Sequence, residues 1–565
     1  MNHHLDLRKK VIIMISVMAS LFLVALDQTI ISTALGRIVE DFNAFSSLSW
    51  IVTAYLITTT IATPIAGKLS DMYGRRLLLM VGVTIFGVAS LFSGMAGDIN
   101  QLIIWRAIQG IGGGIITANA FTIIGDLFAA RERGRWQGMI GAVFGVSSVV
   151  GPLLGGFLTE SHQILGVTTD WRWTFYINVP IAIAAFIVIA IYCPTLKHED
   201  KPKVDYWGAA LLALALATLV LAVDNTEHIF ADLLASTGMS LTTLRVIMAA
   251  IVISATVAFI AVERRSKEPI LDLAFFKNRN FLILSGIATF VGAAMIGSIL
   301  YLTQFNQQVY GAGPTTSGLM LLPMIAGLML VSITTGQLVS KYGKYKRFMV
   351  GGFVVAGLAI GSLVTLTPTS TYIHEAIIIF FVGAGIGAAM PLMNIAIQNE
   401  FEQKDLGVAT SSSQLFRGLG STIGVAVFGS MLTLGIGNNL GDMNKDAYVQ
   451  ALRQSPSASQ FISNPNDTNT LLALNMPTTK DKINQGFAES MTNVALPATQ
   501  KQQVMDNFTD KQNAYSTKLV NAFTGSLHVI FMITSTMMLL ALALVSMLKE
   551  RTLHYASPTE TPGEI

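Results

Sequence analysis

The sequence predicts an all-α integral membrane protein with fourteen membrane-spanning helices. Of the 565 residues, 52% are hydrophobic and only 12% are charged, whereas a soluble globular protein carries about 25% charged residues. The mean hydropathy is correspondingly positive, at +0.58. The apolar residues are also gathered into long runs, and a bilayer-spanning helix needs roughly 20 such residues.

Fourteen runs have the length and composition of a span. They cover residues 11–35, 50–70, 77–96, 101–127, 138–160, 175–193, 205–224, 243–263, 281–303, 315–338, 347–368, 374–396, 407–435 and 521–548. The first run follows basic residues, as in a secretory signal, but it continues to Leu35 without a small-residue cleavage site. We therefore expect an uncleaved first span.

The basic residues of the short loops predict the orientation. One set of alternate loops holds Arg75, Arg76, Arg131, Arg133, Arg135, Lys197, Lys203, Arg264, Arg265, Lys277, Lys341, Lys344, Lys346 and Arg347. The short loops on the other side hold little beyond Arg37 and Arg172. Because cytoplasmic loops are enriched in Lys and Arg, we expect both termini in the cytoplasm.

One connection is unusually long and polar. Residues 436–520 separate the last two runs, and the topology places them outside the cell. Within this outer segment, DAYVQALRQ and KQQVMDNFTDKQNAYSTKLVNAF have the pattern of amphipathic helices. This outer segment could be a solvated cap without a binding function, or a docking site for an envelope partner.

A charged motif repeats after the second span of each half. The first copy has the form G-x-L-x-D-x-x-G-R-R, and it consists of Gly67, Leu69, Asp71, Gly74, Arg75 and Arg76. The weaker second copy keeps Gly336, Leu338, Gly343 and Lys344 at the same offsets, with Ser340 in place of the acid. Internal repeats are common in transporters. We predict an N-terminal half at 1–200, two additional helices at 201–270 and a C-terminal half at 271–565.

The chemistry of the first copy suggests a conformational latch. Gly67 and Gly74 allow a tight turn and a close helix approach, while Asp71, Arg75 and Arg76 lie at the membrane surface. An ion pair from these side chains to the other half would hold one conformation until the halves rock apart. The alternative is that the bases only fix the topology.

These motifs together resemble the major facilitator superfamily over nearly the whole chain. Gly67–Met80 is similar to its signature loop, RAIQGIGGG at 106–114 to its fourth-span motif, and GVSSVVGPLLGG at 145–156 to its exporters' fifth-span motif. LDQTIISTAL, WIVTAY and WRWTFYINVP resemble stretches of the fourteen-span drug:proton antiporters. The resemblance implies two six-helix halves plus two extra helices. It also implies multidrug efflux, antibiotic resistance and use of the proton motive force in a bacterial cytoplasmic membrane.

Asp27 and Arg106 are the candidate proton-coupling residues. An ionisable side chain inside a span is costly and marks a functional site by default. At 1.5 Å per residue, Asp27 lies roughly 24 Å along the first helix, at a depth similar to Arg106 on the antiparallel fourth span. We expect Asp27 to bind a proton from outside and release it inward, with Arg106 tuning its affinity. A permanent ion pair is the alternative.

Two further groups of residues are candidates for helix movement and for contact with the substrate. Gly145, Gly151, Pro152, Gly155 and Gly156 would let the fifth span kink and pack closely, and in the family this motif accompanies export. Trp50, Tyr55 and Asn178 are candidates to face the substrate cavity, with helix packing as the alternative. Asp126 and Glu132 are expected to be loop charges, which leaves Asp27 as the deep acid.

Other functional classes find little support in the sequence. The net charge of +3 does not indicate a nucleic-acid partner, and the single Cys193 excludes an internal disulfide. No nucleotide-binding or zinc motif is present, so we expect no enzyme activity, no cofactor and no metal. The expected partners are protons, the lipid bilayer and a small molecule, often an amphipathic cation. An exporter of one physiological solute, a non-transporting sensor or scaffold, and a pump with an envelope adaptor protein remain alternatives.

Overall fold

A computed structural model describes residues 6–42, 48–159, 163–164, 167–193, 205–223, 226–402, 405–454, 462, 468–492 and 497–553. Over this part of the chain, fourteen helices are long and apolar enough to cross a membrane. The predicted all-α membrane fold with fourteen spans is therefore confirmed. A short antiparallel hairpin is a minor addition, with two residues in each strand: β1 (Gln163–Ile164) and β2 (Val167–Thr168).

The spans consist of twelve unbroken helices and two that are divided by a short break. The helices are α1 (Leu7–Asp41), α2 (Leu48–Tyr73), α3 (Arg75–Gly94), α4 (Ile99–Leu127), α5 (Arg133–Thr159), α6 and α7 (Trp173–Tyr176, Asn178–Tyr192), α8 (Tyr206–Val223), α11 (Leu241–Glu263), α12 (Arg279–Val309), α13 and α14 (Pro314–Leu319, Leu322–Tyr342), α15 (Lys346–Ser362), α16 (Tyr372–Gln398), α17 (Leu406–Leu440) and α21 (Ala498–Ser546). Shorter helices are α9 (Thr226–Ile229), α10 (Ala231–Thr237), α18 (Ala447–Gln454), α19 (Thr468–Asn475) and α20 (Pro477–Thr492).

Local chemistry sets several helix ends. Asp98 caps α4, because its side chain accepts a hydrogen bond from the backbone N–H of Gln101. Gly343 ends α14 with a φ of 69°, in the left-handed region that glycine adopts without strain. Gly74, with a φ of 94°, separates α2 from α3. Both repeats of the charged motif thus have a glycine turn where a helix ends.

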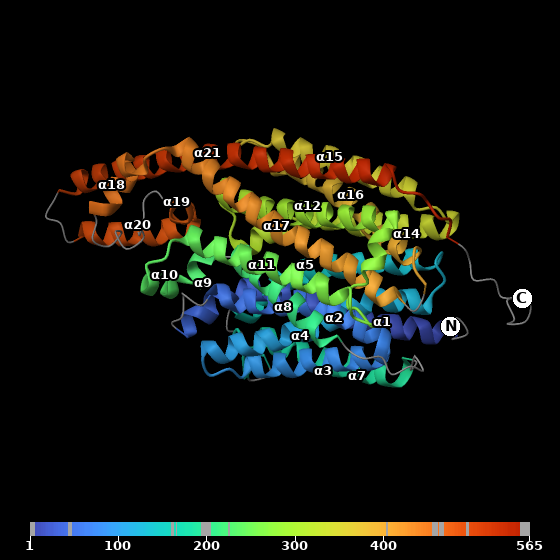
Figure 1. The fold of residues 1–565 in the computed structure, drawn as a ribbon. Helices are drawn as coiled ribbons and strands as arrows, with labels where there is room; N and C mark the ends of the chain where they lie inside the picture. Colours follow the sequence, from blue (N-terminus) through green and yellow to red (C-terminus); the bar gives the residue numbers. More distant parts are fainter. Residues whose placement is uncertain are drawn as a thin grey trace, which may run out of the picture.

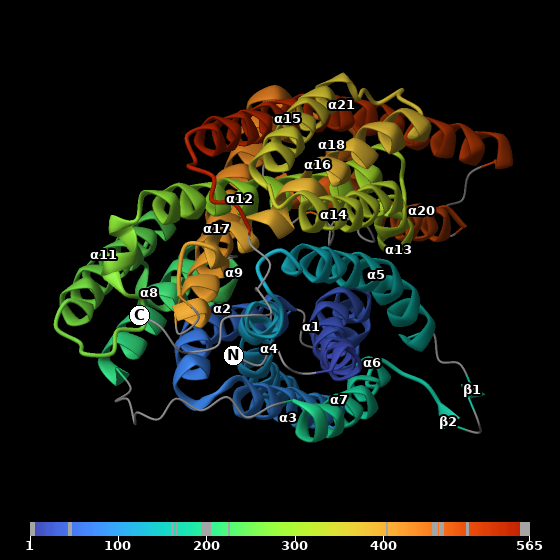
Figure 2. The ribbon, with the colours of Figure 1, turned by 90° about the vertical axis from the view of Figure 1, so that its right-hand side faces the viewer.

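The helices form two bundles that face each other (Figures 1 and 2). Helices α1–α7 make one bundle, and α12–α17 with α21 make the other. The bundles meet where α5 packs on α14 and α2 packs on α17. Helix α8 packs on α11, on α2 and on α17, so this extra pair lies beside the junction of the bundles. The boundaries near residues 200 and 270 remain predictions, since 194–204 lie outside the described residues.

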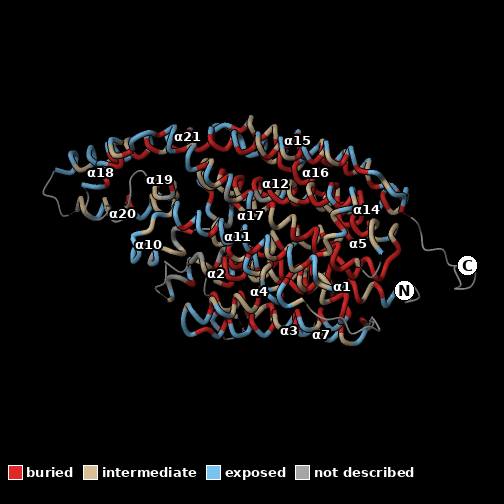
Figure 3. The backbone as a smooth tube through the Cα atoms, viewed as in Figure 1, coloured by how far each residue is buried: buried red, intermediate tan, exposed pale blue. Residues whose placement is uncertain are grey.

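The molecule has two distinct ends (Figure 1). Helix α1 begins and α21 finishes at one end, which we call the terminal end. Helices α9, α10 and α18–α20 lie at the opposite end, which we call the distal end. Buried residues lie between the helices, whereas many exposed residues lie on the outer surface (Figure 3). Exposed Leu77, Val88, Ile187 and Leu358 give that surface the apolar character that lipid contact requires.

The outer segment differs in one respect from its prediction. Helix α18 matches the expected amphipathic stretch, but residues 501–523 are the first half of α21 and not a separate helix. No Gly or Pro interrupts 498–524, so nothing breaks the helix before it enters the last span. Tyr448, Phe508 and Tyr515 of this segment are buried in the same core as the second bundle.

Candidate functional site

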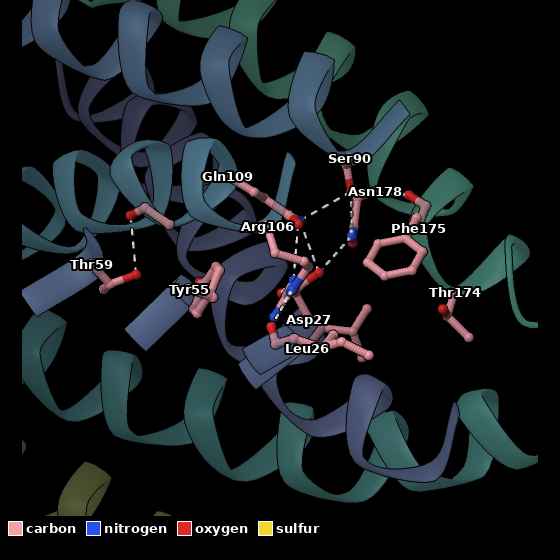
Figure 4. Close-up of polar contacts among 12 residues, drawn as sticks. Leu26, Asp27, Tyr55, Thr59, Ser90, Arg106, Gln109, Thr174, Phe175 and Asn178 are labelled. Carbon is pink, nitrogen blue, oxygen red and sulfur yellow. Dashed lines mark hydrogen bonds and ion pairs between the residues drawn. The ribbon is translucent and has the colours of Figure 1, made fainter. Parts of the chain in front are cut away.

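A buried ion pair joins α1 to α4. The Nη1 atom of Arg106 lies 2.5 Å from Oδ2 of Asp27, and each side chain is only 1% exposed (Figure 4). The Tyr55 ring lies 4.4 Å from the Arg106 guanidinium carbon, in the position of a cation–π contact. The two residues that the sequence singles out from different helices are therefore in direct contact.

Amide side chains complete this network (Figure 4). Gln109 donates a 2.8 Å hydrogen bond to Oδ1 of Asp27, and Asn178 of α7 donates one of 3.3 Å to the same atom. Both amides also donate to the hydroxyl of Ser90 on α3, at 3.1 and 2.9 Å. Asp27 thus accepts from three residues, which offsets the cost of burying its charge.

The network has a direct chemical consequence. Protonation of Asp27 would remove the partner of a fully buried guanidinium, and an uncompensated buried charge costs several kcal/mol. If Asp27 were protonated, rearrangement of α1 against α4 would therefore be favoured. The same geometry would also serve as a permanent fastening of these helices.

Three of the sequence candidates meet at Asp27, and one does not. Arg106, Tyr55 and Asn178 surround it, whereas Trp50 lies half-buried at the start of α2. The neighbouring Ile51 contributes its carbonyl oxygen, which accepts from Nε of Arg106. Ser90 and Gln109 were not identified from the sequence as members of this network. Gln109 had a signal, because it follows Arg106 by three residues and so lies on the same helix face.

The charged motif crosses between the bundles through Asp71. Its Oδ2 atom accepts a 2.9 Å hydrogen bond from the backbone N–H of Val408, and its Oδ1 atom accepts one of 3.1 Å from Gly407. Both donors are in the first turn of α17, where unpaired N–H groups and the helix dipole favour an anion. The expected ion pair to the other half is replaced by a carboxylate at a helix N-terminus.

The arginines of the motif bond within their own half. Arg75 pairs with Asp71 and, at 2.7 Å, with Asp126 of α4, so Asp126 is a buried partner and not a loop charge. Arg76 donates to the carbonyl of Ala190 on α7. The guanidinium of Arg75 holds the Asp71 carboxylate in position for α17, while Arg76 fixes α3 against α7.

Glycines allow the helices to approach at the same junction. A Cβ atom on Gly67 would lie 2.4 Å from Cβ of Ser411 on α17. On the α5–α14 side, a Cβ on Gly336 would lie 2.2 Å from the carbonyl oxygen of Gly134. Arg131 adds a 2.7 Å hydrogen bond to the carbonyl of Ser340. At the terminal end, the two bundles are thus in backbone contact.

The fifth-span motif packs α5 on both bundles. A Cβ on Gly151 would overlap the Thr29 hydroxyl of α1, which itself donates to the carbonyl of Ser147 at 2.9 Å. Gly145 faces Met329 of α14. Pro152 lies inside α5, Gly155 is buried, and Gly156 accepts a hydrogen bond from Thr159. Small residues are thus placed where α5 touches α1 and α14.

A cavity of about 170 Å³ lies between the bundles. Its walls come from helices of both, and they include Phe121, Gln137, Phe144, Leu328, Asn394 and Arg417. Arg417 is the one charged side chain among these described lining residues, and no described carboxylate lies within 4 Å of it. It donates instead to Gln414 and lies 5.9 Å from the Phe121 ring. Asp27 does not line this cavity.

The comparisons with known proteins give the family. A model of the Major Facilitator Superfamily matches residues 17–425. Multidrug transporter protein MdtP of Bacillus subtilis is 34% identical over 529 residues, which is 93% of each chain. Multidrug resistance protein 3 of the same organism is 35% identical, over 76% of this chain and 81% of its own. The chain therefore belongs to the Major Facilitator Superfamily of membrane transporters.

Solved structures agree in fold. The proton:xylose symporter XylE, solved with a bromodeoxyglucose, has a TM-score of 0.54 at 17% identity, over 74% of this chain and 88% of its own. The human organic anion transporter MFSD10 has a TM-score of 0.55 at 14% identity, over 75% of this chain and 94% of its own. In the part of the chain that the structure describes, no three His, Cys, Asp or Glu side chains gather as a metal site would require.

Proposed function

We propose that the protein is a proton-coupled exporter of amphipathic drugs and dyes in the cytoplasmic membrane of a bacterium. The names of its bacterial relatives support drug export. The excess of Lys and Arg in the loops of the terminal end supports a cytoplasmic location for that end. The protein would move drug outward while protons move inward, by alternating access.

The observation that carries proton coupling is the buried pair of Asp27 and Arg106. While the pair is closed, the Asp27 carboxylate accepts hydrogen bonds from Arg106, Gln109 and Asn178. A proton from outside neutralises Asp27, and the freed Arg106 charge then disfavours the present packing of α1, α2 and α4. When the halves rock, Asp27 releases the proton to the cytoplasm and the pair closes again.

The latch would convert this local event into opening at the cytoplasmic side. Asp71 holds the first turn of α17, and the glycine contacts hold α5 against α14. Each contact joins opposite halves, so both must separate before a substrate can enter from the cytoplasm. Since Arg75 bonds to Asp71 and also to Asp126 of α4, the latch is tied to the helix that carries Arg106.

The charge in the cavity bears on the substrate. A cationic drug would be attracted by Asp27 only after Asp27 leaves Arg106, and proton and drug would then compete. Arg417, in contrast, presents an uncompensated positive charge to the cavity wall. An acidic or polar group on the substrate would satisfy it. Arg417 therefore favours a second candidate function, the export of one physiological solute that carries an acidic group.

The first test is ethidium efflux from energised cells. Cells producing the wild type or Asp27→Asn are loaded with ethidium, with and without a protonophore. We expect wild-type efflux that stops when the gradient is dissipated, and no efflux by a well-expressed variant. Efflux by both proteins would move the proton site elsewhere. Absence of wild-type efflux would favour either export of a physiological solute or a non-transporting sensor. Uptake of acidic solutes into inverted vesicles would distinguish these two possibilities.

A further inference from the structure

A second buried carboxyl lies in the other half of the molecule. Glu375 is in the first turn of α16, and its side chain is 0% exposed. Neither carboxylate oxygen has a hydrogen-bond partner in the described part of the chain. No Lys or Arg nitrogen of the described residues lies within 4 Å of it. Unlike Asp27, Glu375 has no counter-charge among the residues that the structure describes.

The polar groups nearest to Glu375 form no well-formed hydrogen bond within the described residues. Asn306 of α12 and Tyr310, just beyond that helix, are neutral donors that face the carboxyl, at a geometry too loose for a well-formed hydrogen bond. Tyr310 and Tyr372 are the titratable groups that face Glu375 in the described residues. Burial, with the Glu375 carboxyl as a second cause, raises the pKa of Tyr310 to about 12, so its hydroxyl stays neutral.

The internal repeat relates this carboxyl to the ion pair of the first half. The offset of 269 residues that takes Gly67 to Gly336 also takes Arg106 to Glu375. Helix α16 packs between α14 and α15 as α4 packs between α2 and α3. Arg106 lies seven residues after the start of α4, and Glu375 lies three residues after the start of α16, about one turn nearer the helix end. Each half thus buries one ionisable side chain near the start of this helix, a base in the first half and an acid in the second.

The buried position of Glu375 determines whether its carboxyl group carries a proton. A carboxylate that is removed from water without a nearby cation is strongly disfavoured, even where neutral donors such as Asn306 and Tyr310 lie beside it. In this conformation Glu375 therefore carries a proton. The carboxyl becomes able to ionise only when water or a donor reaches it. The nearby α12 turn is held by the outer segment, since Asn475 donates to the side chain of Gln308 at 2.9 Å.

We propose that Glu375 is a second proton-binding site of the transporter, which exchanges its proton as the α12 and α16 ends rearrange between conformations. This inference rests on the proposed proton-coupled export. Each cycle would then carry one proton on Asp27 and a second on Glu375. The number of protons sets the drug gradient that a given pH gradient can sustain, and this equilibrium quantity does not depend on the transport rate.

The test measures that equilibrium in liposomes with the full chain. The voltage is clamped at zero, a pH gradient is imposed, and the ratio of a neutral dye across the membrane is read when net flux stops. Removing one coupled proton lowers that ratio about tenfold per pH unit of gradient. We expect this loss for Glu375→Gln. The exposed neighbour in His374→Gln should leave the ratio unchanged.

The outcomes distinguish failure of the second proton site from failure of the proposed function. An unchanged ratio in Glu375→Gln, with the wild type driven by the gradient, would overturn the second site alone. A wild type that ignores the gradient would overturn the proposed function itself. If Glu375→Gln is folded but inactive, Glu375→Asp decides. Transport by Glu375→Asp at the wild-type ratio supports a titratable group, whereas inactivity of both variants assigns Glu375 to packing.

Discussion

Asp71 and Val408 are 337 positions apart in the chain, yet the Asp71 carboxylate accepts a 2.9 Å hydrogen bond from the Val408 backbone. The contact joins α2 of the first bundle to the first turn of α17 in the second. A carboxylate at a helix N-terminus needs no matching basic side chain. The second half can therefore complete the latch with backbone atoms alone.

The first prediction concerns this latch. Asp71→Asn removes the negative charge at the start of α17 and should weaken the closed terminal end by about 1–2 kcal/mol. Spin labels at the exposed Tyr73 and Tyr342, with Cys193 replaced by serine, report the distance between the halves. We expect a larger population of long distances. Asp98→Asn is the matched control, since asparagine caps a helix as well as aspartate.

The second prediction concerns the glycine contact of α5 with α14. In Gly336→Ala, the new methyl group would meet the Gly134 carbonyl at 2.2 Å, so the helices must move apart. Closed-state population and transport should both fall. Gly351→Ala is the control, because no atom lies within 4 Å of the added group. Equal behaviour of the two variants in spin-label distances would contradict the role of the contact.

The third prediction separates stability from coupling at the buried pair. Asp27→Asn leaves the Arg106 charge uncompensated and should lower the free energy of unfolding by about 3–5 kcal/mol. Asp27→Asn combined with Arg106→Gln should recover most of that loss, because no buried charge remains. Thermal unfolding in detergent measures both variants. If the double variant recovers stability and also shows normal pH-dependent transport, the Asp27–Arg106 pair only holds the helices together and does not couple protons.

The fourth prediction concerns the cavity. Arg417→Gln removes the uncompensated charge from the wall and should shift selectivity toward cationic dyes and away from acidic ones. Paired binding measurements with a cationic and an acidic dye of similar size give the ratio of affinities. Arg245→Gln changes an exposed arginine on α11 and should leave that ratio alone. An unchanged ratio in Arg417→Gln would separate Arg417 from substrate recognition.

The sequence was most informative where the membrane itself imposes the pattern. Span length follows from bilayer thickness, so all fourteen helices were predictable. The contact of Asp27 with Arg106 followed from equal depth on antiparallel helices. Ser90 was not predictable, because a serine within an apolar span is common and its partners come from α4 and α7.

One acid was misjudged and another was missed, for the same physical reason. Asp126 and Glu375 lie near the ends of apolar runs, where a charge normally reaches water. Asp126 is buried because Arg75 comes from another helix to pair with it. Glu375 is buried where α16 packs against α12, with Asn306 and Tyr310 beside the carboxyl. Burial at span ends depends on tertiary packing that hydropathy along the chain does not contain.

Drug-driven proton movement in sealed proteoliposomes tests proton coupling through the Asp27–Arg106 pair. A dye gradient is imposed without any pH gradient, and internal pH is followed for the wild type and for the variant that combines Asp27→Asn with Arg106→Gln. We expect proton flux opposite to the dye in the wild type and a clearly smaller flux per dye molecule in the variant. An unchanged ratio of protons to dye would contradict coupling through the Asp27–Arg106 pair.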